Sequence, residues 1–196
     1  MLRIAFVKDM PGDALDDPEF VKKVRVWFND LQPAGLETVS IYRAIGMQAQ
    51  TVYIFKSNNS REIDKLIEYW REFPFEISLG LDWGELFSLR GLQIVKQKGK
   101  GPLYLALMKN IPQWALDDQE FLTKARTWFN DRQPAGFETV GLYRVVGTYA
   151  ATLHVFTAQN HEDVDTFVSY WRECACEVSL AVDWREQLQR RGVSVV

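Results

Sequence analysis

The chain has 196 residues, with 23 basic and 26 acidic side chains and a formal net charge of −3. Its basic residues form no cluster larger than the short run Lys96, Lys98 and Lys100, which argues against a nucleic-acid partner. Apolar runs stay well short of the roughly 18 residues that a membrane span needs, and the first residues lack the apolar core and cleavage site of a signal peptide. We therefore expect a cytoplasmic protein without a membrane or nucleic-acid partner.

The first half of the chain begins with a predicted strand and helix. Residues 3–8 are apolar or alternating over the length of a strand. Asp17 and Pro18 then supply a capping carboxylate and a first-turn proline for an amphipathic helix. Residues 36–45 and 51–56 are rich in β-formers and are separated by a short turn, so they predict a hairpin.

A second helix and a last strand complete the predicted pattern. Asn59 is a good capping residue and starts the helix, and residues 75–81 have the composition of a strand. The order β-α-β-β-α-β is that of a ferredoxin-like domain.

The same pattern recurs 101 residues later without an insertion. About 40 of 85 aligned positions are identical, among them the Trp-Phe-Asn-Asp sequence of residues 27–30 and 128–131. This internal duplication predicts an α+β protein with two tandem ferredoxin-like repeats, residues 1–95 and 102–196, and a solvated linker at residues 96–101.

Helices on one face of each predicted sheet leave the other face open, so we expect the repeats to pack sheet to sheet as a pseudo-dimeric α/β barrel. Alternation along the strands divides each sheet into two faces. The aliphatic set, which we place under the helices, is Ile4, Phe6, Val39, Ile41, Val52, Ile54, Ile77, Leu79 and Leu81. The opposite set mixes rings, small residues, hydroxyls and a carboxylate, as in a lined cavity. It comprises Ala5, Val7, Thr38, Ser40, Tyr42, Thr51, Tyr53, Phe55, Glu76, Ser78 and Gly80, with Ala106, Met108, Thr139, Gly141, Tyr143, Thr152, His154, Phe156, Glu177, Ser179 and Ala181 in the second repeat.

Three short sequences, together with the element order, resemble a known superfamily. They are Pro-Ala-Gly-Leu-Glu at residues 33–37, Tyr-Trp-Arg at residues 69–71 and Phe-Glu-Ile at residues 75–77. Together they resemble the dimeric α/β-barrel superfamily, and more closely a bacterial branch of single ferredoxin-like domains that has no assigned function. The resemblance implies a barrel that holds small apolar or aromatic compounds. Members of the superfamily include cofactor-independent monooxygenases, polyketide cyclases, isomerases and haem-degrading enzymes, so the fold does not choose a reaction.

His154 is the most suggestive candidate for catalysis. The alternation points it into the predicted cavity, within reach of Tyr143 and the carboxylate of Glu76 or Glu177, where it would act as general acid or base. The structural alternative is that His154 makes the buried hydrogen bonds that Tyr53 makes in the first repeat. The two glutamates likewise either tune the histidine or form a structural clasp at the barrel mouth.

The remaining predicted site residues would contact a ligand. They are Tyr42, Tyr53, Phe55, Ser78, Met108, Tyr143, Phe156 and Ser179. We expect no metal and no cofactor, because the Cys174 and Cys176 pair aligns with Phe73 and Phe75 and fits buried packing better than metal binding. Haem ligated by His154 remains an alternative.

The predicted function is the binding of a small apolar or aromatic molecule in the barrel interior. The sequence leaves open whether metal-free acid–base chemistry of the cyclase, isomerase or cofactor-independent oxygenase type follows. The rival prediction is a non-catalytic scaffold or stress-associated interaction module whose barrel is filled by its own side chains. Exposed edge strands leave association into a homodimer of this chain open.

Overall fold

The computed structural model describes the chain except residues 12, 47–50, 113, 148–151 and 196. It forms two compact units, the first from residues 1–79 and 181–196, the second from residues 80–180. These units cut across the predicted repeats. Residues 80–95, which end the first repeat in sequence, belong to the second unit, and residues 181–196 belong to the first.

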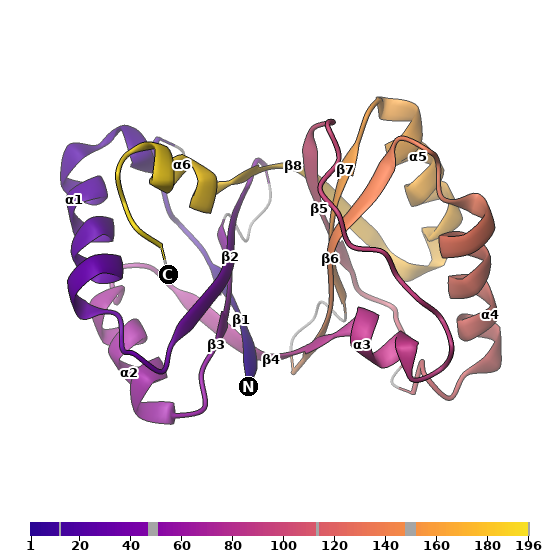
Figure 1. Ribbon diagram of the computed structural model, residues 1–196, viewed down its shortest axis with the longest axis horizontal. Coiled ribbons are helices and arrows are strands. Elements are labelled where there is room, and N and C mark those ends of the chain that lie inside the picture. Colours follow the sequence, from indigo (N-terminus) through magenta and orange to yellow (C-terminus); the bar gives the residue numbers. More distant parts are fainter. Residues whose placement is uncertain (12, 47–50, 113, 148–151, 196) are drawn as a thin grey trace. The chain divides into compact units, whose positions relative to one another are not determined.

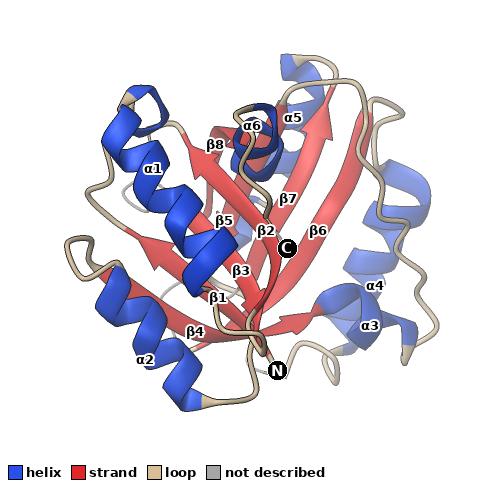
Figure 2. Cartoon of the chain, turned by 60° about the vertical axis from the view of Figure 1, so that its left-hand side comes forward, coloured by secondary structure: helices blue, strands red, loops and turns tan. Residues whose placement is uncertain are grey.

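The first unit is an α+β sandwich of one sheet and its helices. Its elements are β1 (Leu2–Val7), η1 (Ala14–Asp16), α1 (Pro18–Val26), η2 (Trp27–Leu31), β2 (Glu37–Ala44), β3 (Thr51–Lys56), α2 (Ser60–Tyr69), most of β4 (Phe75–Asp82), the end of β8 (Cys176–Asp183) and α6 (Trp184–Arg190). The strand order is β4-β1-β3-β2-β8, antiparallel, and α1 and α2 lie on one face of the sheet (Figures 1 and 2).

The second unit repeats this arrangement. Its elements are the end of β4, α3 (Trp83–Ser88), β5 (Leu103–Met108), α4 (Gln119–Thr127), η3 (Trp128–Arg132), β6 (Phe137–Val146), β7 (Thr152–Ala158), α5 (His161–Tyr170), η4 (Arg172–Cys174) and most of β8. The strand order is β8-β5-β7-β6-β4. Because β4 and β8 each belong to both sheets, the hydrogen-bonded order of the eight strands closes on itself as an antiparallel barrel.

The helices start where the sequence predicts caps. The Asp17 carboxylate accepts the backbone N–H of Glu19 at 2.9 Å, and Asn59 Oδ1 accepts that of Arg61 at 3.0 Å. Both α1 and α4 continue into a π-helical turn, Trp27–Leu31 and Trp128–Arg132. No helix within the described residues is long and apolar enough to cross a bilayer.

The two short helices after β4 and β8 complete the cores. In the first unit Trp184 and Leu188 of α6 share a core with Trp27, the first residue of η2, and Trp70, which directly follows α2. The second unit receives α3, which is labelled in Figure 1, in the same way. Trp83 and Phe87 of this helix belong to the second unit's core. The hydrogen bonds of Arg191, directly after α6, agree with the placement of this segment in the first unit. Its guanidinium donates to the Leu15 carbonyl and to the Asp16 carboxylate.

The predicted division of the sheet faces is wrong for β1, β3, β5 and β7. Ala5, Val7, Tyr53 and Phe55 lie under the helices of the first unit, whereas Ile4, Phe6, Val52 and Ile54 lie on the opposite face. In the second unit Ala106, Met108 and Phe156 are placed in the same way, and so is His154, whose ring contacts Phe167 of α5. Two facts explain the inversion. Both faces of these strands are apolar, so their alternation does not say which face the helices cover.

The second fact is a register shift in the hairpins. It lies between Thr38 and Ser40 in β2 and between Thr139 and Gly141 in β6. The extra residue lets Thr38 and Ile41 lie on the helix side together, which strict alternation forbids. Tyr42 and Ser40 therefore lie on the helix-free face, as predicted.

Candidate functional site

His154 lies in the core between sheet and helices rather than in a cavity on the other face. The side chain is 2 % exposed and sits among the rings of Phe137, Phe156 and Phe167, whose centroids are 5.3 to 5.6 Å from its own. Its Nε2 is joined to Thr139 Oγ1 at 3.0 Å. Burial lowers the pKa of His154 to about 3, so the imidazole is neutral at physiological pH.

The predicted acid–base pair does not form within the second unit. Glu177 and Tyr143 lie on the helix-free face, so the sheet separates them from His154. The prediction that His154 is within reach of these residues is wrong, because it rested on the inverted face of β7. Among the described residues the hydrogen-bond partner of this buried imidazole is a hydroxyl and not a carboxylate, which suits general base catalysis poorly.

Tyr53 is the counterpart of His154 in the first unit. Its hydroxyl is joined to Thr38 Oγ1 at 2.9 Å, and burial raises its pKa. Tyr53 in β3 and His154 in β7 thus each bond to the threonine 15 residues earlier, on the neighbouring strand of the hairpin. Each threonine lies next to the register shift of that strand. These contacts follow the structural alternative for His154.

The spaces around these two groups are small. The cavity lined by His154, Met108 and Thr152 has a volume of about 20 Å³, and that lined by Tyr53, Met10 and Trp184 about 50 Å³. Small-molecule pockets usually begin near 300 Å³. The residues around His154 therefore do not fit a haem, since the nitrogen bonded to Thr139 and the surrounding rings leave no space for the macrocycle.

Tyr53, Phe55, Met108 and Phe156 were predicted to line a cavity opposite the helices. The structure places all four on the helix side, with exposures of 6 % or less. They fill the two cores and do not share a face with the other predicted ligand contacts. This correction has the same cause as that for His154.

Glu76 near the start of β4 and Glu177 near the start of β8 each form an ion pair with a lysine. Lys8 Nζ lies 3.8 Å from Glu76 Oε2, and Lys109 Nζ lies 3.5 Å from Glu177 Oε2. All four side chains are partly exposed, with 33 to 40 % of their surface accessible. Such pairs contribute about 1 kcal/mol or less, and they correspond to the structural clasp rather than to a catalytic base.

Four of the predicted ligand contacts are buried polar residues on the helix-free faces, as predicted: Tyr42, Ser78, Tyr143 and Ser179. They are 4 to 8 % exposed. In the first unit Tyr42 pairs with Val52 of β3 on one side and with Asp183 of β8 on the other, and Ser78 pairs with Ile4. Burial raises the pKa of Tyr42 to about 12, so its hydroxyl keeps its proton and acts as a donor at neutral pH.

Tyr143 is held differently from Tyr42. Its ring covers Gly141, where an added Cβ would lie 2.7 Å from a ring carbon. The corresponding residue of the first unit, Ser40, bears a side chain. The two tyrosines therefore offer their hydroxyl groups in different surroundings.

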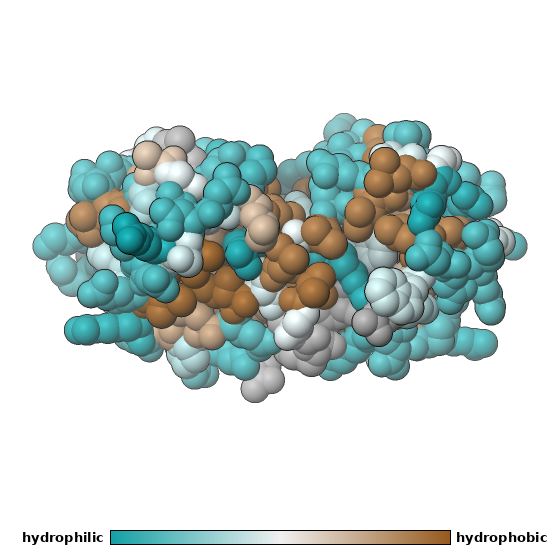
Figure 3. Space-filling view, turned by 90° about the horizontal axis from the view of Figure 1, so that it is seen from below, coloured by the Kyte–Doolittle hydropathy of each residue, from teal (hydrophilic) through white to brown (hydrophobic). Residues whose placement is uncertain are grey.

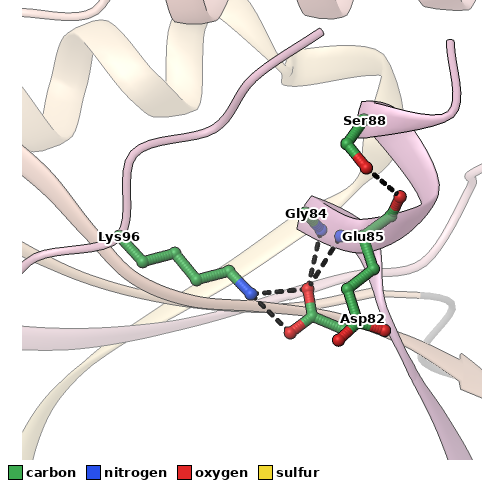
Figure 4. A network of polar contacts seen from close by, with 5 residues as sticks. All are labelled: Asp82, Gly84, Glu85, Ser88 and Lys96. Carbon is green, nitrogen blue, oxygen red and sulfur yellow. Dashed lines mark hydrogen bonds and ion pairs between the residues drawn. The ribbon is translucent and has the colours of Figure 1, made fainter. Parts of the chain in front are cut away.

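Sequence reasoning missed a polar network at the start of α3 (Figure 4). The carboxylate of Asp82 accepts the backbone N–H groups of Gly84 and Glu85 at 2.8 and 3.3 Å, and both its oxygens lie 2.5 Å from Lys96 Nζ. The ammonium group also lies 6.0 Å from the centroid of the Tyr143 ring. The predicted linker is thus anchored at its first residue, Lys96. The Asp-Trp sequence after the strand could have suggested that Asp82 caps a helix, but no sequence signal indicated its ion pair with Lys96.

Metal binding has no support from side-chain clusters in the described part of the chain, where no group of three His, Cys, Asp or Glu residues has the required proximity. Cys174 and Cys176 are free thiols. Burial raises the pKa of Cys176 to about 12, so the thiol is a poor nucleophile and a poor ligand.

Neither a family model nor a curated protein matches the sequence. Solved structures do match. A putative chlorite dismutase is 12 % identical with a TM-score of 0.53, and the match covers 96 % of this chain and 97 % of that one. A variant of chlorite dismutase from Candidatus Nitrospira defluvii is 14 % identical with a TM-score of 0.58, over 96 % and 94 %. A putative monooxygenase from Lactobacillus acidophilus is 11 % identical with a TM-score of 0.50, over 93 % and 92 %. At these identities the likeness concerns the fold.

Proposed function

On the premise that the chain has the dimeric α/β-barrel fold, which its structural neighbours confirm across nearly its whole length, we propose that it binds a small, mostly apolar molecule against the helix-free face of its sheets. The observation that carries the proposal is the buried Tyr42, which lies on the helix-free face with the aliphatic Val52 and Ile54 and the small Ser40. An apolar wall with a few polar groups that fix orientation is the usual lining of a small-molecule site.

The tyrosines have a binding role in this proposal. The Tyr42 hydroxyl is hydrogen-bonded to Ser40 and, with a pKa of about 12, keeps its proton. In the complex it would exchange Ser40 for a carbonyl or ether oxygen of the ligand, as a donor and not as a base. On this face of the first unit Ser78 supplies a smaller hydroxyl, and Tyr143 and Ser179 occupy the equivalent positions on the second unit's own helix-free face. His154 takes no part, because it lies beneath the helices. The names of the neighbours, a chlorite dismutase and a putative monooxygenase, agree with small-molecule chemistry.

We also infer that the two halves arose by duplication. Residues 101 positions apart make equivalent contacts: Arg90 bonds to the carbonyl of Leu116 as Arg191 bonds to that of Leu15. Further association into a homodimer and a cytoplasmic location stay predictions.

A non-catalytic interaction module is the second candidate. The hydrogen bond between Tyr42 and Ser40 favours it, because a hydroxyl that bonds to the protein has no need of a ligand partner. Under this function the hydroxyls of the helix-free face would bond only to the protein itself.

Conservative substitutions distinguish the two candidates. The double variant Tyr42→Phe/Tyr143→Phe removes two hydroxyls and keeps both rings, and Tyr53→Phe removes one buried hydroxyl from the opposite face as a control. We would titrate each protein with anilinonaphthalene sulfonate, a fluorescent probe with apolar aromatic rings and one sulfonate, and examine protein purified from its own host by native mass spectrometry. Tighter probe binding to wild type than to the double variant, with Tyr53→Phe unchanged, supports the site. Absence of both a retained molecule and probe binding would overturn it in favour of the interaction module.

A further inference from the structure

A cavity of about 50 Å³ lies in the core of the first unit, between the sheet and the helices α1, α2 and α6. On the sheet side its wall includes Val7 of β1 and Tyr53 of β3. On the helix side the wall includes Val24 of α1, Leu66 of α2 and Leu188 of α6. These five residues are 1 to 6 % exposed, so the cavity belongs to the interior of the unit.

The hydroxyl groups in this wall already have partners in the protein. Tyr53 Oη is joined to Thr38 Oγ1 at 2.9 Å. Thr51 Oγ1 accepts a hydrogen bond from Arg43 Nη1 at 3.2 Å and donates one to the sulfur of Met10 at 3.4 Å. The other side chains of the wall are aliphatic or aromatic, whereas a buried water needs about two to four polar partners. The cavity therefore suits an apolar occupant better than water.

The second unit packs the equivalent region more tightly. Its cavity has a volume of about 20 Å³ and is lined by Phe87 and Met108, which stand where the first unit has Leu188 and Val7. Ala125 is smaller than its counterpart in the first unit, yet the second cavity remains the smaller of the two. This fold can therefore fill the region. Since an apolar core loses packing contacts wherever a cavity remains, the larger cavity of the first unit is unfavourable for stability and indicates an occupant.

The volume and the wall restrict the chemistry of the occupant. An apolar cavity of about 150 Å³ binds benzene or xenon, so about a third of that volume fits one xenon atom or a molecule of about two heavy atoms. Trp27 Nε1 adds one buried donor, which lies near the Tyr53 hydroxyl. One donor is too few for a water but is compatible with a weak acceptor atom. These are the properties of a site for an apolar diatomic gas such as dioxygen.

The partly exposed part of the wall is aromatic. Phe20 of α1 and Phe28 of the following π-helical turn line the cavity and are partly exposed. The ring centroid of Phe20 lies 6.0 Å from that of Trp184, and the centroid of Phe28 lies 6.5 Å from that of Tyr53. Figure 3 shows that hydrophobic residues reach the surface in patches on one face of the molecule. An apolar molecule thus reaches the cavity when a partly exposed ring moves, which is a fast motion.

We propose that the core cavity of the first unit binds an apolar diatomic gas, with dioxygen as the gas tested. The site lies on the helix side of the sheet, so it does not depend on the ligand proposed for the helix-free face. Val7, Leu66 and Leu188 contact the gas through their methyl groups. A ligand of about two heavy atoms gains little free energy on binding, so its occupancy is low at ambient concentration and rises with gas pressure.

The test uses the full chain with carbon-13-labelled methyl groups and records NMR spectra under gas pressure. Xenon shifts the signals of methyl groups beside its site. Dioxygen is paramagnetic and, relative to nitrogen, raises the relaxation rates of nearby protons. We expect both effects at Val24 and Leu66. Leu122 and Val164 of the second unit's core are the reference, because they are 2 and 6 % exposed and should respond less.

Reciprocal exchanges between the units test the location of the site. Leu188→Phe introduces the residue of the second unit and should abolish the xenon shifts and the oxygen effect at Val24 and Leu66. Phe87→Leu is the matched control. It should leave the response of the first unit unchanged and add a response at Leu142, which lines the second cavity.

Circular dichroism checks that each variant is folded, and Val7→Met, the other exchange, serves if Leu188→Phe does not fold. An equal response at Val24, Leu66 and the two reference residues would overturn the proposal. A response that persists in a folded Leu188→Phe or Val7→Met variant would also overturn it, as would xenon shifts without an oxygen effect at the same methyl groups.

Discussion

The burial of His154 makes the stability of the protein depend on pH in a window that can be worked out. The imidazole has a pKa of about 3 in the folded chain and 6.5 as an unperturbed group. Above pH 6.5 it is neutral in both states, so the folded chain has its full stability there. As the pH falls from 6.5 towards 3, only the unfolded chain binds the proton, and the free energy of unfolding falls.

The magnitude follows from the size of that window. Each pH unit within it costs about 1.4 kcal/mol, so between pH 7 and pH 5 the folded state loses about 2 kcal/mol. Solvent does not attenuate this effect, because the ring is 2 % exposed.

Urea denaturation at pH 7 and at pH 5 measures the loss. His154→Gln keeps a polar group able to reach Thr139 but does not titrate, so we expect the difference between the two pH values to shrink by about 2 kcal/mol. His161→Gln is the control, because His161 is the other histidine and is exposed at the start of α5. If His154→Gln retained the pH dependence of the wild type, the histidine would have to be accessible to protons in the folded chain.

Further predictions concern the helices α6 and α3, each of which packs in the unit opposite to its own repeat, and the linker. Leu188→Ala should cost about 2–5 kcal/mol in urea denaturation, because this α6 residue is 1 % exposed in the first unit's core; a loss near zero would mean that the segment does not pack there. Gly101→Ala should cost about 1–3 kcal/mol, since the new Cβ would lie 2.0 Å from the Ala158 carbonyl oxygen, and a melting temperature equal to that of wild type would contradict this close approach. Asp82→Ala should cost about 1 kcal/mol and Asp82→Asn less, because asparagine still caps α3; equal losses would assign the effect to the ion pair with Lys96.

Local patterns predicted the elements well. The predicted strand at residues 51–56 coincides with β3, and the caps at Asp17 and Asn59 start α1 and α2. These signals are local, because a capping side chain bonds to a backbone group two or three residues away, and tertiary structure did not override them.

The faces of the strands were not predictable in this way. In β1 four successive residues, Ile4 to Val7, are 0 to 3 % exposed, so their pattern contains no polar residue that marks an outer face. For this reason the predicted site combined Tyr42 with His154. In the structure Tyr42 lies on the helix-free face of its sheet, whereas His154 lies on the helix side of its own. The register shift after Thr38, which causes part of the error, has no glycine or proline that would reveal it.

The sequence by itself determined the order of the elements, the helix caps and the likeness of the two halves, because each of these depends on neighbours along the chain. Only the tertiary structure decided which sheet face the helices cover, and in which unit the ends of β4 and β8 and the helices α3 and α6 pack. The physical reason is that Trp83 and Trp184 must be buried in an apolar core, yet the sequence around them is compatible with either core. The choice depends on contacts between residues about 100 or more positions apart, such as Arg191 with Asp16, and no local pattern records them.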